Sequence, residues 1–440
     1  MKRRSFLRVG AAAGAGVLAA CSSRPIPRPG VGVLVVGGGV AGCAVGYFLA
    51  LQGLEVTLAE RHGVAGYASG HAAGQLSPLA VPEPVRPLAA ASFGLHLALW
   101  DHLRTTSGVD FEARRSAMIR LALDRADLPA LERALAATRR DQARLAHALD
   151  LGPGHGLDVV PMSGDEVRAL EPRISDEVVA ALRTDGNAVI DSRGFTTALL
   201  RSAQRAGLVA RRGEVGALVT SGRRVTEVDL GGARVRCEAL VIATGPWAGA
   251  LGRRLDLLVP IEPIKGELLH LDLAVDHDVG TGVGNDRRGG RDADLRTGNE
   301  DGAGPAVDWS GPDSSLYARG GRILVGHTWE RRGFDLVPRA DTRDLLLAHA
   351  RRLMPAVATA QVLGHTACLR PVPRDGRPLI GRAPGWDNVY LAAGGGKKGI
   401  LLSLAMGRAV TELIAHGRTE LPIAACAPDR FARTYQVPSP

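Results

Sequence analysis

Six consecutive residues, 37–42 with the sequence GGGVAG, have the spacing of a phosphate-binding turn. Gly37 would permit a tight turn, and Gly39 would let a pyrophosphate approach backbone N–H groups at the start of a helix. Gly42 would let that helix pack closely on the preceding strand. The chemistry predicted for these residues is the binding of a dinucleotide by backbone groups.

The elements on either side can position this turn. A nearly continuous apolar run, Val31–Val36, precedes it, an apolar helical pattern continues through Leu51, and a second strand covers Glu55–Ala59. The order strand, turn, helix, strand is the context that the glycine pattern requires. Glu60 closes the second strand, where its carboxylate would accept hydrogen bonds from ribose hydroxyls. A glycine-rich turn in another kind of βαβ unit is the alternative, and the motif does not distinguish FAD from NAD.

A segment after the second strand indicates the cofactor. Residues 67–78 read YASGHAAGQLSP and resemble the loop that wraps the FAD diphosphate in flavoenzymes of the D-amino-acid-oxidase (DAO) type. Small residues in this loop would allow the backbone to lie against the cofactor. These small residues are Ser69, Gly70, Ala73 and Gly74. His71 occupies a variable slot of the motif, and we interpret it as a loop histidine rather than a catalytic base.

Later segments resemble the same family. Residues 213–218 (GEVGAL) and 239–248 (ALVIATGPWA) are similar to two later pieces of its nucleotide-binding domain, in which the backbone of Val215 would contact adenine. Residues 368–381 and 389–403 are similar to the closing segment of glycine oxidases. The resemblance therefore extends over most of the chain.

The resemblance implies FAD as the cofactor and assigns its contacts residue by residue. The assigned positions are Gly37, Gly39, Val40, Ala41, Gly42, Glu60, Arg61, Ser69, Gly70, Ala73, Gly74, Gln75, Val215, Gly245, Trp247, Gly395, Gly396, Lys398, Gly399 and Ile400. The glycine-rich approach to the last helix would direct N–H groups at the electron-rich edge of the flavin and stabilise negative charge there. No metal site is expected, because the five cysteines show no metal-ligand spacing.

The catalytic residues implied by the resemblance are Arg370, Lys397 and Tyr317. Arg370 would hold the carboxylate of the substrate, since a planar guanidinium binds a carboxylate through two hydrogen bonds. Glycine oxidases place an aromatic residue and an arginine where this chain has Gly396 and Lys397, so the predicted site has a smaller wall and a point charge as its second cation. Tyr317 and His327–Thr328 resemble strand positions near the substrate, and ordinary sheet positions are the alternative.

Cys368 has two interpretations. It stands two residues before Arg370, and the segment is similar to the one in which monomeric sarcosine oxidases carry the cysteine that bonds covalently to FAD. A small buried core cysteine is the preferred alternative.

The expected fold class is α/β, with a doubly wound, Rossmann-like FAD-binding domain that is discontinuous in sequence. It would comprise residues 31–110, 155–260 and 365–420, and residues 111–154 and 261–364 would form an inserted α+β substrate domain with an antiparallel sheet. Residues 276–313, rich in Gly, Asp and Arg, would form a flexible insertion.

Periodicity and capping patterns place the remaining elements. The expected substrate-domain strands are Met118–Leu123, Gly266–Leu273, Ser315–Tyr317 and Arg322–Gly326. The expected helices are Val85–Thr105, Leu128–Leu151, Phe195–Ala206 and Ile400–Ala415, with a further helix opened by a capping box at Ser163–Glu166. Lys265–Glu267 matches a turn of the family. After the leader, no apolar segment is expected to reach membrane-spanning length.

The first 21 residues have the pattern of an export signal. Arg3 and Arg4 belong to a twin-arginine-like motif, and residues 18–21 (LAAC) resemble a lipobox in which Cys21 would be lipidated. Residues 22–30 would be a tether, and the protein would be periplasmic or in the cell envelope; a cytoplasmic enzyme with a frayed apolar N-terminus is the alternative. The formal charge of +9 comes from scattered arginines and not from a basic run, so nucleic acid is not an expected partner.

These observations predict an FAD-dependent oxidoreductase that oxidises a C–N bond of a small amine or amino acid, such as glycine, sarcosine or a D-amino acid. A hydride would pass to flavin N5 and the imine product would be hydrolysed, with oxygen or a membrane carrier as the electron acceptor. Two alternatives stay open from the sequence. One is a catalytically silent flavin-binding redox or ligand sensor, and the other is the flavin domain of a tRNA wobble-uridine modifier.

Overall fold

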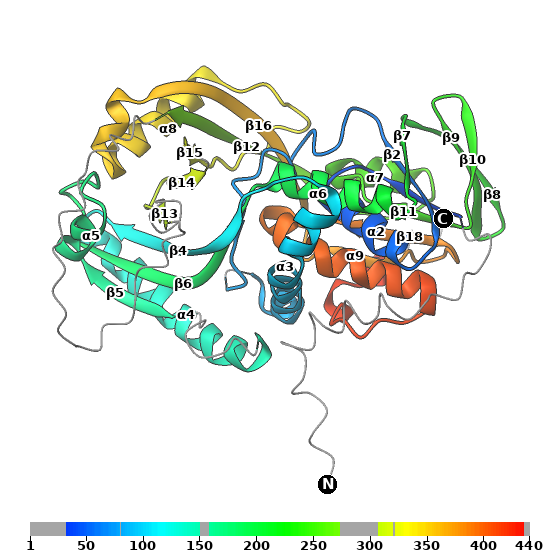
Figure 1. The fold of residues 1–440 in the computed structure, drawn as a ribbon, viewed down its shortest axis with the longest axis horizontal. Helices are drawn as coiled ribbons and strands as arrows, with labels where there is room; N and C mark the ends of the chain where they lie inside the picture. The colour runs from blue at the N-terminus through cyan, green and yellow to red at the C-terminus, as the bar shows by residue number, and fades with distance from the viewer. Residues whose placement is uncertain (1–31, 80, 150–157, 273–306, 320–321, 435–440) are drawn as a thin grey trace, which may run out of the picture.

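The computed structural model describes residues 32–79, 81–149, 158–272, 307–319 and 322–434. The predicted signal and tether, including Cys21, lie outside this part of the chain. Two lobes stand side by side in Figure 1. We call them the nucleotide lobe, which contains the glycine-rich turn, and the substrate lobe.

A six-stranded sheet forms the centre of the nucleotide lobe. Its order is β17 (Leu379–Arg382), β18 (Val389–Ala393), β11 (Ala239–Ile242), β1 (Gly32–Val36), β2 (Glu55–Glu60) and β7 (Val209–Arg212). All neighbouring strands are parallel except β17, which runs antiparallel to β18. The three strands β1, β11 and β18 come from distant parts of the sequence, so this domain is discontinuous, as predicted.

Successive residues of β1 enter different cores, because strand side chains alternate between the two faces of a sheet. Val33 and Val35 pack with helices on one face. Leu34 and Val36 pack on the other face with a three-stranded sheet. The helices are α2 (Val40–Leu51), α3 (Arg86–Ser107), α6 (Ser192–Arg205) and α9 (Gly399–His416). The small sheet is β8 (Val215–Ser221), β9 (Arg224–Leu230) and β10 (Ala233–Arg236), followed by α7 (Ala248–Arg253).

The substrate lobe is built on a nine-stranded sheet. Its order is β16 (Gln361–Pro373), β12 (Ile261–Asp272), β15 (Arg322–Gly326), β14 (Ser315–Arg319), β13 (Val307–Ser310), β4 (Ala113–Ala122), β6 (Ala180–Ile190) and β3 (Gln75–Leu76), with β5 (Val159–Ser163) paired to β6. All pairs are antiparallel except β13 with β4. The helices α4 (Leu128–Leu149), α5 (Gly164–Leu170) and α8 (Ala340–Leu353) belong to this lobe. The capping box is present at α5, with Ser163 and Glu166 bonding reciprocally.

Several predicted boundaries differ from the structure. The sequence pattern assigns residues 155–260 to the nucleotide lobe, but β5, α5 and β6 lie in the substrate lobe. Most of the predicted insertion 276–313 lies outside the described residues, and its last part forms strand β13 in place of a flexible segment. Lys265–Glu267 is not a turn, because it lies in the middle of β12.

The expectation about apolar length is also wrong for one segment. Residues Gly396–His416, which contain α9, are long and apolar enough to cross a membrane. Much of this segment is buried, since α9 packs between α2 and α3 in the core of the nucleotide lobe.

Candidate active site

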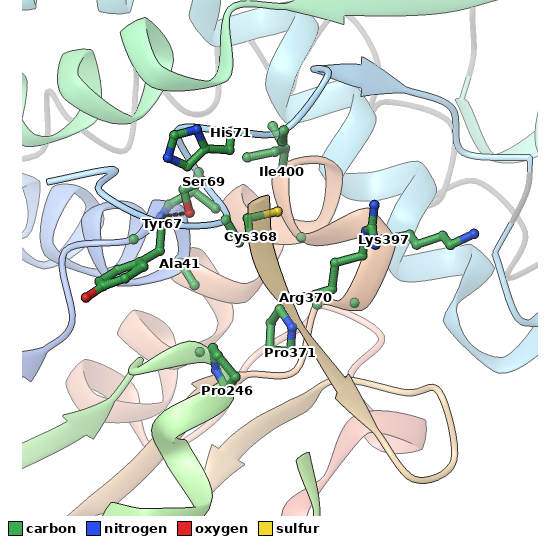
Figure 2. Close-up of a pocket in the computed structure, with 18 of the residues that line it drawn as sticks. Ala41, Tyr67, Ser69, His71, Pro246, Cys368, Arg370, Pro371, Lys397 and Ile400 are labelled. Carbon is green, nitrogen blue, oxygen red and sulfur yellow. Dashed lines mark hydrogen bonds between the residues drawn. The ribbon is translucent and has the colours of Figure 1, made fainter. Parts of the chain in front are cut away.

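A cavity of about 700 Å³ lies between the two lobes. The turn before α2, the loop 66–77, the end of β11 and the turn before α9 contribute its walls on the side of the nucleotide lobe. Strands of the substrate lobe complete the cavity. Figure 2 shows two of these elements meeting: β16, which carries Cys368, Arg370 and Pro371, passes the start of α9 at Lys397 and Ile400.

The glycine turn before α2 forms one end of the cavity. Gly37 has φ +113°, and a Cβ at this position would lie 2.4 Å from the carbonyl oxygen of Ala243. At Gly42 a Cβ would lie 1.9 Å from the carbonyl oxygen of Gly37, so the helix can approach the turn only without a side chain there. α2 has no acidic residue in its first turn, its N-cap residue Gly39 has no side chain, and the N–H of Val40 donates to Ser69 Oγ at 2.9 Å. The positive end of the helix therefore faces the cavity and can bind a phosphate.

Glu60 lies at the end of β2 beside this turn. Its Oε2 accepts a hydrogen bond of 2.7 Å from the N–H of Gly38, and its Oε1 accepts one of 2.9 Å from the N–H of His62. An ionised carboxylate has about four lone-pair sites, so both oxygens can accept a further bond from a sugar hydroxyl. The backbone bonds fix the orientation in which Glu60 would meet that hydroxyl.

Aromatic and charged side chains form the wall beyond Glu60. Arg61 pairs with Glu214 at 3.2 Å and lies 4.8 Å from the ring centre of Trp247. The Trp247 ring also stacks on Phe334, with centroids 5.7 Å apart. Because Phe334 belongs to the loop after β15 of the substrate lobe, this stack joins the two lobes beside the cavity. Val215 lines the same end of the cavity.

The loop 66–77 is held against the substrate lobe by a buried ion pair. Arg319 donates to both carboxylate oxygens of Asp308, at 2.6 and 2.9 Å. The same guanidinium donates through Nε to the carbonyl of Ala73 at 2.8 Å, and Gln75 donates to Asp308 at 3.3 Å. The pair therefore fixes the loop segment whose small residues border the cavity.

A second helix N-terminus meets the cavity at α9. The glycines before it, Gly394–Gly396, line the cavity, and α9 has neither an acidic residue in its first turn nor a side-chain cap from its N-cap residue, Lys398. His96 of α3 donates from Nε2 to the carbonyl of Ile400 at 3.0 Å, which fixes the first turn of α9. Lys398 donates to the carbonyl of Ser77, and burial followed by the charge of Lys397 lowers its pKa to about 8.

Arg370 extends from β16 across a neighbouring glycine of β12. Its Nη1 donates to the carbonyls of Thr328 at 2.8 Å and of Lys265 at 3.4 Å. Within the described residues, its Nε and Nη2 have no partner, and no carboxylate pairs with it. A Cβ on Gly266 would lie 2.2 Å or less from three atoms of the guanidinium. The absence of a side chain at Gly266 therefore makes room for the guanidinium. The N–H groups on Nε and Nη2, which have no partner in the described part of the chain, can donate to a carboxylate.

Beside Arg370, Lys397, His327 and Tyr317 form a hydrogen-bonded row. Lys397 Nζ donates to His327 Nε2 at 3.1 Å, and His327 Nδ1 lies 3.3 Å from the hydroxyl of Tyr317. Burial, followed by the charges of Arg370, Lys397 and Lys398, lowers the pKa of His327 to about 4. His327 is therefore neutral at pH 7, with Nε2 accepting from the ammonium and Nδ1–H donating to the hydroxyl.

Two buried hydroxyls show that the cavity fits a polar group. Thr244 Oγ1 and Ser77 Oγ line it, and neither has a hydrogen-bond partner among the described residues. Buried polar atoms are normally satisfied, so a bound molecule would supply the missing partners. Together with the two helix N-termini and Glu60, they make a cradle that suits a dinucleotide with a negatively charged diphosphate.

The model of the DAO family, described as FAD dependent oxidoreductase, matches residues 32–413. The chain belongs to this family. FAD is therefore its cofactor, and the helix N-termini of α2 and α9 with Glu60 are the groups that would hold it. The predicted family, fold class and enzyme class are confirmed.

Glycine oxidases and D-amino acid dehydrogenases match this chain over most of its length and over nearly all of their own. Glycine oxidase of Pseudomonas aeruginosa is 29% identical over 87% of this chain and 94% of its own. D-amino acid dehydrogenase of Paramagnetospirillum magneticum is 27% identical over 91% of this chain and 98% of its own. The crystal structure of glycine oxidase from Geobacillus kaustophilus is similar with a TM-score of 0.77, 26% identity, and coverage of 91% of this chain and 99% of that one.

The structure brings together nearly all the residues that the sequence predicts for the site. Every one of them lines the cavity except Gly42 and Gly70. Gly42 allows the close helix packing described above. A Cβ on Gly70 would lie 2.0 Å from the carbonyl of Ala65, so Gly70 is required by the packing of its own loop. Neither Gly42 nor Gly70 lines the cavity, so the cofactor contact assigned to each of them stays a prediction.

Sequence reasoning missed other residues of this FAD-dependent oxidoreductase. Gly266, the Asp308–Arg319 pair and Trp329 were outside the predicted set, and His327 was named only by resemblance. The role of Gly266 beside Arg370 could have been found from the sequence, since a glycine inside a strand often marks a close approach of another group. Asp308 had no such signal, because it lies inside residues 276–313, the segment predicted to be a flexible insertion.

Cys368 lines the cavity from β16, and Figure 2 shows it on the same strand as Arg370 and Pro371. It is buried, and burial raises the pKa of its thiol. A protonated thiol is a weak nucleophile. Both interpretations of Cys368 therefore stay predictions, and they are separated by asking whether flavin stays with the polypeptide after denaturation.

Proposed function

We propose that this FAD-dependent oxidoreductase oxidises the C–N bond of a small amino acid that carries a carboxylate on the carbon to be oxidised. The proposal rests on the position of Arg370 and on its unpaired hydrogen-bond donors. Arg370 lines the cavity, its Nε and Nη2 have no partner among the described residues, and the missing side chain at Gly266 gives its guanidinium room. A carboxylate is the small group that matches these donors in both charge and shape.

The reaction removes two electrons and two hydrogens from the substrate. When bound, FAD supplies the acceptor for a hydride from the α-carbon. The amine gives up a proton as the C–N single bond becomes a C=N double bond, and water then hydrolyses the imine to a carbonyl compound and an amine. Arg370 would hold the carboxylate so that the α-carbon stays in one position, and orientation of this kind contributes much of an enzymatic rate.

The charges around the site favour a neutral substrate amine. Arg370, Lys397 and Lys398 line the cavity, and none of them forms an ion pair with another described residue. Like charges destabilise an ammonium group, so these cations would lower the pKa of a bound amine. The deprotonated amine has the lone pair needed to form the C=N bond. No carboxylate base is required, and the acids that line the cavity in the described part of the chain are engaged elsewhere: Glu60 by backbone, Glu214 by Arg61 and Asp308 by Arg319.

The names of the relatives support an amino acid as the substrate. They are glycine oxidases and D-amino acid dehydrogenases. These names give no support to the silent sensor or to the tRNA-modifying domain. They differ in the electron acceptor that they imply, and measuring oxygen consumption separates an oxidase from a dehydrogenase that needs another carrier.

The first test is anaerobic reduction of the flavin in the purified holoenzyme. Glycine, sarcosine, proline and several D-amino acids are added in turn, and the visible absorption of oxidised flavin is followed. We expect at least one of them to bleach it. Matched amines without a carboxylate, such as methylamine for glycine, should bleach it much more slowly.

Two variants of Arg370 make the test specific. Arg370→Met should lower kcat/KM for the best amino acid by roughly a hundredfold or more, because a buried charged hydrogen-bond pair is lost. The kcat/KM of Arg370→Lys should lie between those of Arg370→Met and the wild type, since lysine keeps the charge but lacks the planar guanidinium that binds a carboxylate through two hydrogen bonds. A flavin that no amino acid bleaches, or an Arg370→Met enzyme with full activity, would count against the proposal.

We also propose that the protein is exported in its folded form to the cell envelope. The support is the Arg3–Arg4 motif and the LAAC pattern ending at Cys21. Export after folding suits a flavoprotein, because FAD must be bound where it is made. Cell fractionation tests this proposal.

A further inference from the structure

The cavity has more positive charge than one substrate carboxylate requires. Besides Arg370, it is lined by Lys397, Lys398 and Arg120, and none of these forms an ion pair within the described part of the chain. Arg319 and Arg61 also lie near the cavity, but each is paired with an acid, Asp308 or Glu214. The diphosphate of FAD would supply counter-charge in the same cavity, and Lys398 is one of the predicted FAD contacts. Arg370 and Lys397 remain as the cations predicted to face the substrate, and two neighbouring cations without acids favour a ligand with more than one negative charge.

Lys397 is the cation best placed to receive a second anionic group. Its side chain is exposed while it also lines the cavity, so it lies at the cavity rim. Its Nζ lies 4.6 Å from the ring centre of Trp329, and the guanidinium of Arg370 lies 5.7 Å from the same ring. The two cations therefore share one wall of the site.

The contacts of Lys397 fix its position and leave donor capacity. One N–H donates to the neutral His327, at 3.1 Å, and the ring of Trp329 supplies a cation–π contact. An ammonium has three N–H donors, and no other hydrogen bond of Lys397 is present among the described residues. His327 in turn contacts Tyr317, which is buried in β14. Lys397 is thus oriented by neutral groups while its charge stays uncompensated.

From this arrangement we infer that the substrate is a dicarboxylic amino acid, whose first carboxylate binds Arg370 and whose second carboxylate binds Lys397 at the rim. This inference rests on the proposed function, since it names the substrate class of the same site. The C–N oxidation is unchanged in its bonds and electrons. The second carboxylate takes no part in it and sets only which substrate is selected. Compounds of this class are N-carboxymethyl amino acids, such as iminodiacetate, and acidic D-amino acids.

The test compares substrates that differ by one carboxylate. Iminodiacetate is compared with sarcosine, and D-aspartate with D-alanine, using the rate of anaerobic flavin reduction in the holoenzyme. We expect the second-order rate constant of flavin reduction by the diacid of at least one pair to exceed that by its monoacid about tenfold, which corresponds to about 1.4 kcal/mol.

Variants at two rim cations assign the effect to Lys397. Lys397→Met should lower the diacid-to-monoacid ratio about tenfold, and Lys397→Arg should largely keep it. Arg120→Met is the matched control, because it removes one charge from the same cavity on another strand, β4. A general effect of charge would change the ratio equally in both variants.

A binding measurement separates recognition from turnover. Unreactive malonate or succinate should perturb the flavin spectrum at lower concentration than acetate does, and Lys397→Met should remove the difference. Equal rates for both members of each pair would overturn the dicarboxylate inference and leave the proposed function intact. So would a Lys397→Met variant that slows both members equally, or a ratio lost only in Arg120→Met. If none of these amino acids reduces the flavin, the proposed function fails as well.

Discussion

At the scale of single residues, the site depends on a position without a side chain. Arg370 lies across Gly266, where any Cβ would overlap the guanidinium. The two residues belong to neighbouring strands and are paired near one another, since Gly266 faces Cys368 and Ile264 faces Arg370. The substrate-binding group is thus placed by the sheet register and by the space that one glycine leaves.

Gly266→Ala should therefore impair catalysis far more than folding. The added methyl would meet the flexible end of Arg370, which can move away at small cost to stability. The moved guanidinium would lose its carbonyl partners at Thr328 and Lys265 and would present the wrong edge to the substrate. We expect KM for amino acids to rise about tenfold or more, with the thermal unfolding midpoint changed by only a few degrees.

Gly364→Ala provides the matched control. Gly364 lies in β16, and the nearest atom to its added Cβ is in His270 at 3.9 Å, which is ordinary contact distance. This variant should keep the wild-type KM. If Gly266→Ala also keeps it, Arg370 does not depend on the space at Gly266.

Other single residues show why parts of the site were not predictable from the sequence. Lys265 and Glu267 look like surface residues, but both side chains are fully buried in β12 and pair at 3.0 Å. Asp335, which pairs with Lys265 at 2.8 Å, comes from a loop some 70 residues away. Local composition cannot reveal a partner at that separation, and the resemblance to the family suggested a turn at Lys265–Glu267.

At the scale of elements, the turn between β1 and α2 has the strictest geometry. Gly37→Ala would place a Cβ 2.4 Å from the carbonyl of Ala243 at a residue with φ +113°. The backbone of the turn or of β11 would have to move, and either movement alters the phosphate cradle. We expect the variant to be purified with little FAD and to lose at least about 1 kcal/mol of stability. Flavin absorbance per polypeptide and denaturant unfolding measure the two effects.

Gly385→Ala separates backbone strain from the cradle. Gly385 also has a positive φ, +78°, but a Cβ there would meet no atom within 4 Å. It lies between β17 and β18, away from the cavity lining. This variant should be moderately destabilised and retain its FAD. Equal FAD loss in both variants would mean that general destabilisation, and not the turn, releases the cofactor.

The predictability of elements follows their pattern. β1, α2 and α9 were predicted within one or two residues, because their apolar runs are bounded by glycines. β6 was assigned to the wrong lobe, since its central residues, 184–187 with the sequence TDGN, interrupt the alternation expected of a strand. β13 has only four residues, Val307–Ser310, which is too short for periodicity to be visible beside a Gly/Asp-rich segment.

At the scale of the whole molecule, burial gives the histidines a common effect on stability. The pKa values of His71, His96, His270, His327 and His365 are all lowered, in each case chiefly by burial. A group whose pKa is lower in the folded state binds more protons in the unfolded state between the two pKa values. Stability is therefore complete above the unfolded value of about 6.5 and is lost as the pH falls toward the folded value.

His96 should make the clearest contribution to this acid sensitivity. It is fully buried between α3 and α9, and its pKa is lowered from 6.5 to about 4. Acidification from pH 7.5 to 4 should cost up to about 3 kcal/mol through this residue alone. Urea unfolding of the wild type and of His96→Gln across this range measures the difference.

The variant should be less stable at pH 7.5 and show a shallower loss on acidification. Glutamine does not titrate, but it can still donate to the carbonyl of Ile400. If the two proteins lose stability in parallel between pH 6.5 and 4, His96 is not a source of the acid sensitivity.

The order of strands β18, β11 and β1 has a consequence for biosynthesis. The glycine turn is made near the start of the chain, but the cavity closes only when β18 joins β11 and α9 packs against α2. Ribosomes add about 5–20 residues per second, so roughly 20–70 s separate the synthesis of the turn from that of α9. During that interval the apolar face of α2 has no α9 to cover it. The nascent chain therefore exposes this apolar face until α9 has been made, and we expect FAD to be bound only after α9 has packed.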